Sequence, residues 1–264
     1  METRQIWLKI ADSTNAVAWR LWQAGYCRDL WVVALSQSAG VGRRGAHWAS
    51  PVGGLWASRL LCPARPLEVR STSWLGLVVA LATARAVEEV SHVPVRVKWP
   101  NDVVVGTRKL AGILVESRGA DGRAQAAVAG VGLNVNLKRS DFPEPLREAA
   151  TSLYEETGET FSLRAVLLAI ERAFQPLYRA LRQGDYAPLA AQVRQRLLLV
   201  DEQVCVYEED GKVQRGRFDG LDAEGRLVLD TGQAILYFSS DQVHLRAGGK
   251  ALEPGSAPGL GTGF

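Results

Sequence analysis

The sequence predicts an α+β protein, in which helices flank a β-sheet and a small β-barrel follows. Residues 95–116 alternate short apolar runs with turn signals, which indicates consecutive strands. Residues 71–90 and 163–181 carry apolar side chains at helical spacing. After residue 200, short alternating segments are separated by Asp-Gly, Glu-Gly and Thr-Gly pairs, which favours a small barrel.

Composition narrows the class of protein. The chain has 264 residues, 47% hydrophobic and 22% charged, which suits one sizeable core and a smaller one. Its net charge of +3 is not gathered into one basic run, and its most apolar run, 74–82, is too short to span a bilayer, so we expect neither nucleic acid nor membrane as a partner. Cys27, Cys62 and Cys205 have no metal spacing and are odd in number, which favours reduced thiols in the cytoplasm.

The first candidate site lies at the start of a predicted helix. Ser13, Thr14 and Asn15 precede an apolar-periodic run that Gly25 ends. Helix capping explains these residues as well as function does. The other interpretation is that their hydroxyls and amide donate hydrogen bonds to a ligand at the helix N-terminus.

A glycine-rich, cationic loop follows a predicted buried strand at 30–36. Gln37 leads into Gly40, Gly42, Arg43, Arg44 and Gly45, a composition that suits either a mobile surface turn or a loop that closes over phosphates. The spacing of a P-loop is absent. Trp48 follows, and it suits core packing or stacking on a ring. A strand at 54–61 and the helix at 71–90 come next, and we expect that helix to lie across the sheet.

The central stretch, 95–116, reads as strand, strand, turn, strand. Pro100 should end the first strand, Asn101 and Asp102 suit a turn, and Gly106-Thr107 suits a hairpin tip. Lys109 stands at the start of an apolar strand, where it is either a solvated turn charge or a ligand-binding cation. Gly112 leaves room for a ligand or another backbone.

The rest of the chain divides into a main domain and a barrel. A strand at 125–137 contains Asn134, which suits a strand-end turn or a contact with a purine edge. Helices at 163–181 and 188–198 complete a main domain, 1–199. We assign 200–247 to the barrel and the Gly- and Pro-rich 248–264 to a disordered tail.

Four stretches together resemble the biotin protein ligases. They are Ser13-Thr14-Asn15, the loop 37–48, Lys98-Trp99-Pro100-Asn101-Asp102 with Arg108 to Glu116, and Gly130 to Asn134. Val41 replaces an arginine of the family's loop. The resemblance covers about residues 10–245. It implies a mixed β-sheet flanked by helices, as in class II aminoacyl-tRNA synthetases, and an SH3-like C-terminal barrel. About ten residues precede the first motif, so we expect a short form without the family's N-terminal DNA-binding domain.

The resemblance also implies a reaction. An ATP-dependent ligase of this family activates biotin as biotinyl-5′-AMP, with Mg²⁺, and transfers biotin to a lysine of a biotin carboxyl carrier domain of a carboxylase. Lys109 and Arg43 would be catalytic, and Asp102 is a candidate base; the metal ligands are unknown. The expected biotin-binding residues are Ser13, Thr14, Asn15, Gln37, Gly42, Arg43, Lys109 and Gly112. The expected nucleotide-binding residues are Arg44, Trp48, Asn101 and Asn134.

Three alternatives remain. One is a lipoate or octanoate ligase or transferase of the same fold, and another is a non-catalytic biotin-binding module. A DNA-binding repressor is disfavoured because the N-terminal domain is not expected. The resemblance leaves both a monomer and a homodimer open.

Overall fold

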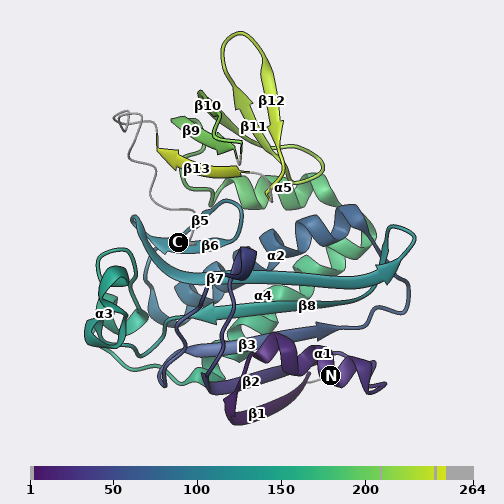
Figure 1. Cartoon of the computed structure of the whole chain (residues 1–264), viewed down its shortest axis with the longest axis vertical. Coiled ribbons are helices and arrows are strands. Elements are labelled where there is room, and N and C mark those ends of the chain that lie inside the picture. Colours follow the sequence, from purple (N-terminus) through teal and green to yellow (C-terminus); the bar gives the residue numbers. More distant parts are fainter. Residues whose placement is uncertain (1–2, 209, 241–242, 248–264) are drawn as a thin grey trace.

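The computed structural model describes residues 3–208, 210–240 and 243–247. These residues form an eight-stranded mixed sheet with helices on both faces and a five-stranded antiparallel sheet that follows it (Figure 1). The predicted α+β class and the C-terminal β-unit are confirmed. The tail expected at 248–264 lies outside the described residues.

The elements of the first unit match most of the expected ranges. The strands at residues 4–11 and 67–68 were not expected, and the helix expected at 188–198 ends at Arg194. The elements are β1 (Arg4–Ala11), α1 (Thr14–Gln23), β2 (Leu30–Gln37), η1 (Arg43–Gly45), β3 (Leu55–Leu61), β4 (Leu67–Glu68), α2 (Val69–Ser91), β5 (Arg96–Lys98), β6 (Asp102–Val105), β7 (Arg108–Ala120), β8 (Arg123–Leu133), η2 (Arg139–Asp141), η3 (Glu144–Leu146), α3 (Leu153–Thr157), α4 (Leu163–Gln183) and α5 (Tyr186–Arg194). The second unit contains β9 (Gln203–Glu208), β10 (Val213–Leu221), β11 (Leu227–Asp230), β12 (Ile235–Phe238) and β13 (Val243–Ala247).

The main sheet runs in the order β1-β2-β3-β8-β7-β6-β5, and β4 pairs with the end of β8. Only β1 and β2 are parallel among its paired strands. No pattern in the sequence predicts β1. Strand β1 is an edge strand, and only Ala11 among its residues is buried. Its sequence therefore lacks the strict two-residue apolar periodicity of a half-buried strand.

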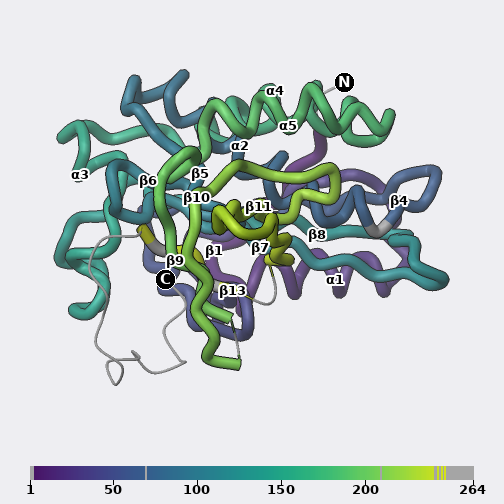
Figure 2. The backbone as a smooth tube through the Cα atoms, turned by 90° about the horizontal axis from the view of Figure 1, so that it is seen from above, coloured from purple at the N-terminus to yellow at the C-terminus, as the bar shows by residue number. Residues whose placement is uncertain are grey.

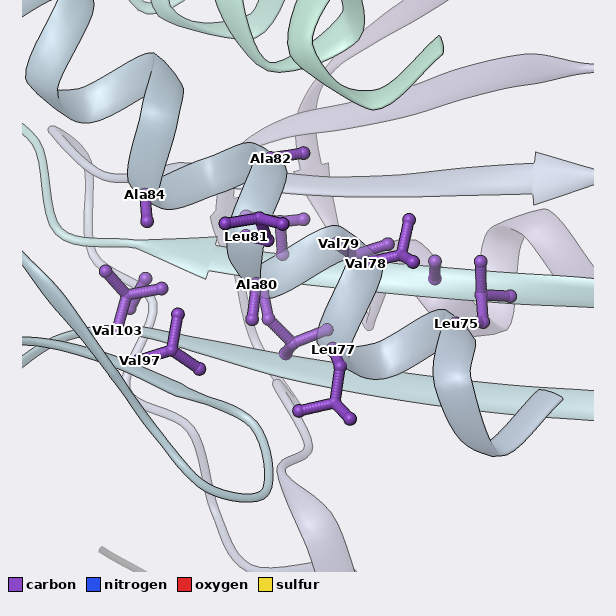
Figure 3. Close-up of a cluster of buried hydrophobic side chains, with 14 of the residues drawn as sticks. Leu75, Leu77, Val78, Val79, Ala80, Leu81, Ala82, Ala84, Val97 and Val103 are labelled. Atoms are coloured by element: carbon purple, nitrogen blue, oxygen red, sulfur yellow. The ribbon is translucent and has the colours of Figure 1, made fainter. Parts of the chain in front are cut away.

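Helices cover the sheet unequally. Figure 2 shows α2, α4 and α5 on one side of the sheet and α1 on the other. Helix α2 is buried around most of its circumference from Trp74 to Val87, because the sheet lies on one side and α4 on the other (Figure 3). Helix α1 covers a smaller apolar cluster that includes Trp19, Leu30 and Val128. No helix of the described residues is long and apolar enough to cross a membrane.

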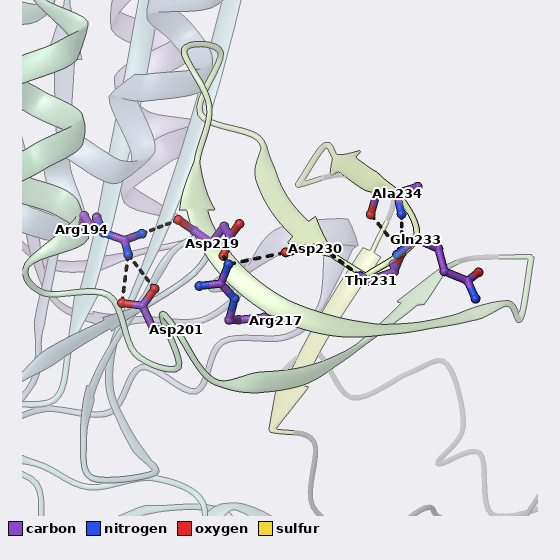
Figure 4. Close-up of polar contacts among 9 residues, drawn as sticks. Arg194, Asp201, Arg217, Asp219, Asp230, Thr231, Gln233 and Ala234 are labelled. Atoms are coloured by element: carbon purple, nitrogen blue, oxygen red, sulfur yellow. Dashed lines mark hydrogen bonds and ion pairs between the residues drawn. The ribbon is translucent and has the colours of Figure 1, made fainter.

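The C-terminal sheet, ordered β12-β11-β10-β9-β13, contacts the main unit through its β10–β11 turn and at the end of α5. Its β10–β11 turn reaches α2, where Ala223 O accepts from Trp74 Nε1 at 2.9 Å, and Gly225 O accepts from Trp99 Nε1 at 3.3 Å. At the end of α5, Arg194 donates to both carboxylate oxygens of Asp201, at 2.7 and 2.9 Å, and to the Asp219 carbonyl (Figure 4). The two units are therefore held together by specific polar contacts.

Candidate active site

The N-terminus of α1 is capped from the neighbouring strand. Ser13 occupies the N-cap position with extended backbone, but its side chain makes no capping hydrogen bond. Instead Gln37 Oε1, at the end of β2, accepts from Thr14 N at 2.7 Å and lies 3.1 Å from Thr14 Oγ1. Gln37 Nε2 donates to Ser50 Oγ at 2.8 Å. The capping interpretation of the Ser13 side chain is therefore wrong, and Gln37 performs that role.

Asn15 anchors a buried polar chain across the sheet. Its Nδ2 donates to Glu116 Oε2 at 2.6 Å, and its Oδ1 lies 2.6 Å from Ser58 Oγ. Ser58 Oγ is also 2.7 Å from Thr14 Oγ1. Thr14, Asn15 and Ser58 are all buried. Gly130 makes room for this chain, because a Cβ there would lie 2.4 Å from Asn15 Oδ1.

The glycine-rich loop folds as a small hairpin. Val41 and His47 pair across it, and Trp48 N donates to Gly40 O at 2.9 Å. Gly42 N donates to Ala46 O at 2.7 Å. At its tip Arg44 and Gly45 have φ of 56° and 75°, so the chain reverses through two left-handed residues. Arg44 is exposed at this tip.

Two consecutive residues hold the two predicted catalytic cations. Asn101 Oδ1 lies 3.4 Å from Arg43 Nη1, and Asp102 Oδ1 lies 2.8 Å from Lys109 Nζ. Asn101 Nδ2 in turn donates to Ile113 O at 2.7 Å, which fixes the amide. Arg43 also donates to the carbonyl of Ser240, which follows β12. The structure thus brings Arg43 and Lys109, 66 positions apart, to one edge of the sheet.

The Trp48 ring packs directly against two glycines of the main sheet. Gly112 and Gly132 are register partners on β7 and β8, and a Cβ on either would come within 2.8 Å of the indole. Lys109 Nζ is 5.1 Å from the centre of the same ring, a cation–π distance. The Trp48 Nε1 is buried and has no hydrogen-bond partner among the described residues. The space that Gly112 leaves is therefore filled by Trp48.

Asn134 and the segment that follows residue 148 border Lys109. Lys109 N donates to Ala149 O at 2.8 Å, and Thr151 N donates to Lys109 O at 2.9 Å. Asn134 is buried, and its Nδ2 donates to Thr151 O at 2.9 Å. The amide nitrogen of Asn134 is therefore already engaged by the backbone.

An ion pair between Arg20 and Asp12 stabilises the N-terminal end of α1. Arg20 donates to both oxygens of Asp12, at 2.7 and 2.8 Å, and this hydrogen bonding holds the pKa of the Asp12 carboxyl well below its usual range. Asp12 O accepts from Ala39 N at 2.8 Å, so the same residue ties α1 to the hairpin loop.

Ser58 and Glu116 also belong to the site, although the sequence patterns did not predict them. Ser58 stands within a strand that is buried throughout, and a polar side chain in such a strand needs a partner, which is the available signal. Glu116 ends the motif that carries the resemblance, but nothing in its neighbours indicates that it meets Asn15 from 101 positions earlier.

A magnesium site is not evident from the protein side chains alone. Within the described ranges, no three His, Cys, Asp or Glu side chains converge closely enough to hold a metal ion. Mg²⁺ commonly binds through one or two carboxylates together with substrate phosphates and water. The residues at the site fit an ion that is held chiefly by a bound nucleotide.

Comparison with known proteins gives consistent matches. Residues 7–134 match the profile of the biotin/lipoate A/B protein ligase family. The chain is 31% identical over 241 residues to the bifunctional ligase/repressor BirA of Bacillus subtilis, covering 91% of this chain and 73% of the relative. It is 32% identical to the biotin–[acetyl-CoA-carboxylase] ligase of Paracoccus denitrificans, covering 83% of this chain and 90% of the relative. A solved biotin protein ligase of Aquifex aeolicus, in complex with biotin and ATP, superposes with a TM-score of 0.80 at 30% identity, covering 93% of this chain and all of that one.

Proposed function

Because the chain belongs to the biotin/lipoate A/B protein ligase family, as a biotin protein ligase, we propose that it forms biotinyl-5′-AMP from biotin and ATP and then transfers biotin to a lysine of a biotin carboxyl carrier domain. The observation that carries this proposal is the placement of Arg43 and Lys109 by the consecutive residues Asn101 and Asp102. The single peptide unit between them sets the spacing of two cations that come from different elements.

The first half-reaction brings a carboxylate to a polyanion. Two unit charges about 4 Å apart repel by ~4 kcal/mol at an effective dielectric of about 20. Cations that are already oriented can offset this repulsion where charge develops in the transition state. Lys109 would bridge the biotin carboxylate and the α-phosphate. Arg43, together with the exposed Arg44 at the hairpin tip, would bind phosphate oxygens.

The polar end of biotin would bind at the N-terminus of α1. Ser13, Thr14, Asn15 and Gln37 gather there, and they match the donors and acceptors of a ureido group. Gly42 lies in the hairpin that would close over the ligand. Gly112 would contribute through Trp48, which lies on it, rather than by direct contact with biotin.

The nucleotide would lie beside Trp48. Its ring would offer a face for an adenine, and the nearby Lys109 would add a polar contact. Asn134 borders the same region. Mg²⁺ bound together with ATP would supply neutralisation of phosphate charge beside Arg43 and Lys109.

The second half-reaction needs a neutral acceptor lysine. Asp102 is the candidate base, but it is paired with Lys109 in the ligand-free protein. We propose that Lys109 turns to the anionic adenylate and so leaves the Asp102 carboxylate able to accept a proton from the acceptor amine. The acceptor would be a carrier domain of a biotin-dependent carboxylase in the cytoplasm.

Two assays test the proposal. ATP–pyrophosphate exchange should depend on biotin, and octanoate and lipoate should support it far less. Transfer of biotin to an apo carrier domain with ATP and Mg²⁺ should then be seen by mass spectrometry. Exchange with lipoate but not biotin would favour the lipoate alternative, and biotin binding without exchange would favour a non-catalytic module.

A further inference from the structure

The buried chain through Asn15 has a fixed proton order. A carboxylate can only accept hydrogen bonds, so Glu116 Oε2, 2.6 Å from the Asn15 amide, requires the NH₂ group of Asn15 to face it. The carbonyl Oδ1 of Asn15 must then point to Ser58, and it has no proton to give. Ser58 therefore donates its single proton to Asn15 across 2.6 Å.

The order continues to Thr14. Because the Ser58 proton is used, the 2.7 Å contact between the two hydroxyls is made by the Thr14 proton. Thr14 Oγ1 also lies near Gln37 Oε1, but that contact is longer, at 3.1 Å, and Gln37 Oε1 already accepts from Thr14 N at 2.7 Å. The Thr14 hydroxyl is left with lone pairs and no proton for a ligand.

A Thr14 hydroxyl that can only accept a hydrogen bond favours a ligand that carries N–H donors. The ureido group of biotin has two N–H donors, whereas the acyl chain and dithiolane ring of lipoate have none. A buried acceptor that loses its solvent without gaining a donor costs about 1–3 kcal/mol, so a site of this kind rejects a ligand without N–H groups.

We propose that Glu116 is a specificity-determining positioning residue: it fixes the proton order through Asn15 and Ser58 so that Thr14 accepts a ureido N–H. This inference rests on the proposed function. Glu116 is exposed on β7 and could be solvated like any surface carboxylate. Its Oε2 instead accepts from two groups on α1, Asn15 Nδ2 and Trp19 Nε1, the latter at 3.3 Å. The Asn15 amide packs closely against Gly130, where a Cβ would lie 2.4 Å from Asn15 Oδ1. This close packing limits the movement of the amide.

The test is Glu116→Gln, which keeps shape and removes the charge. A glutamine can donate to Asn15, so the Asn15 amide can turn over, and Ser58 and Thr14 can then reverse their protons. The Thr14 proton would then meet the ureido N–H. We expect the Kd for biotin, measured by calorimetry, to rise at least tenfold, while the preference over lipoic acid falls by a similar factor. The KM for ATP in pyrophosphate exchange should stay within twofold.

Glu89→Gln is the control for removal of a carboxylate charge. Glu89 is exposed, as Glu116 is, and accepts from Arg172, but it lies on α2 on the opposite side of the sheet. It should leave biotin affinity and preference unchanged. A biotin Kd within twofold of wild type in Glu116→Gln would overturn the inference. So would a loss of biotin affinity matched by a loss of melting temperature beyond the control, because a structural defect would explain both. A wild-type chain that does not bind biotin would overturn the proposed function as well.

Discussion

At the scale of single residues, three glycines of the central strands leave space that other side chains occupy. Gly112 and Gly132 accommodate the Trp48 ring, and Gly130 accommodates the Asn15 amide. All three lie on adjacent strands, β7 and β8, and face the side of the sheet that carries α1. The absent side chains therefore determine where the functional ones can lie.

Gly132→Ala should displace Trp48. A Cβ at this position would lie 2.5 Å from Trp48 Nε1, so the indole must shift, and overpacking of this kind costs about 1–3 kcal/mol. We expect a lower melting temperature and weaker ATP binding, measured by calorimetry. Gly76→Ala is the control, because its Cβ would meet only Val115 Cγ2 at 3.9 Å, and alanine favours the helix. Equal effects of the two substitutions would contradict the inference that Gly132 positions the Trp48 ring.

Lys109→Ala should abolish adenylate formation without unfolding the protein. The ammonium is held by Asp102 at 2.8 Å beside the candidate site, and loss of one preorganised electrostatic contact commonly costs a hundredfold or more in rate. Pyrophosphate release and circular dichroism measure the two parts of the prediction. A rate of pyrophosphate release close to that of wild type in this variant would refute the catalytic assignment.

Cys62 should make stability sensitive to alkaline pH. Burial, then the contact with the Cys27 thiol and the charge of Asp29, raise the pKa of Cys62 to about 12 from 9.0. The folded state therefore holds this proton more tightly than the unfolded state. Its contribution is fully present below pH 9 and is lost as the pH rises towards 12. Cys62→Ser should flatten the fall in melting temperature across this window, and Cys205→Ser should not.

At the scale of elements, the hairpin of residues 40–48 carries an exposed apolar side chain. Backbone bonds define the hairpin, yet Val41 within it is 47% exposed although it is apolar. A β-branched apolar residue in an exposed position can be covered when a ligand arrives. We interpret Val41 as a packing residue that replaces a cation of the family's loop.

Val41→Gly should release the adenylate faster than Val41→Arg does. Glycine removes the apolar contact and adds backbone freedom, and ordering a residue costs roughly 1–2 kcal/mol. Arginine restores a charge that can pair with phosphate. The dissociation rate of preformed biotinyl-5′-AMP measures the difference. If the glycine variant releases the adenylate no faster than wild type, Val41 has no packing role.

At the scale of the whole molecule, the C-terminal unit reaches the candidate site. The Ser240 carbonyl accepts from Arg43, and the β10–β11 turn holds Trp99, which is only two residues before Asn101. Arg194 fixes the chain between the two sheets through Asp201 and Asp219 (Figure 4). Contacts from the C-terminal unit therefore help to position Arg43 in the main unit.

Arg194→Ala should loosen the second unit and, through it, the hairpin of residues 40–48. Hydrogen exchange at the hairpin and at the β10–β11 turn should increase, and the rate of pyrophosphate exchange should fall several-fold. Arg172→Ala, which breaks the exposed ion pair with Glu89 in the main unit, is the control. Unchanged exchange at the hairpin in Arg194→Ala would show that the two units are not coupled through this contact.

The sequence by itself determined the elements and the motif residues. Apolar periodicity predicted α2 and the strands of 95–116, and the motifs pointed to Lys109, Arg43 and the start of α1. These signals are local, since they depend on residues a few positions apart. The edge strand β1 had no such signal, because few of its side chains are buried.

The tertiary structure alone decided the partners of those residues. Gln37 replaces the Ser13 side chain as the cap of α1 because β2 ends beside that helix. Glu116 meets Asn15, and Asn101 meets Arg43, only because the strand order places β7 and β6 at those positions. Polar contacts of this kind require two atoms to approach within roughly 3.5 Å. Contacts between residues 58 or 101 positions apart depend on the packing of the whole sheet, which no local pattern encodes.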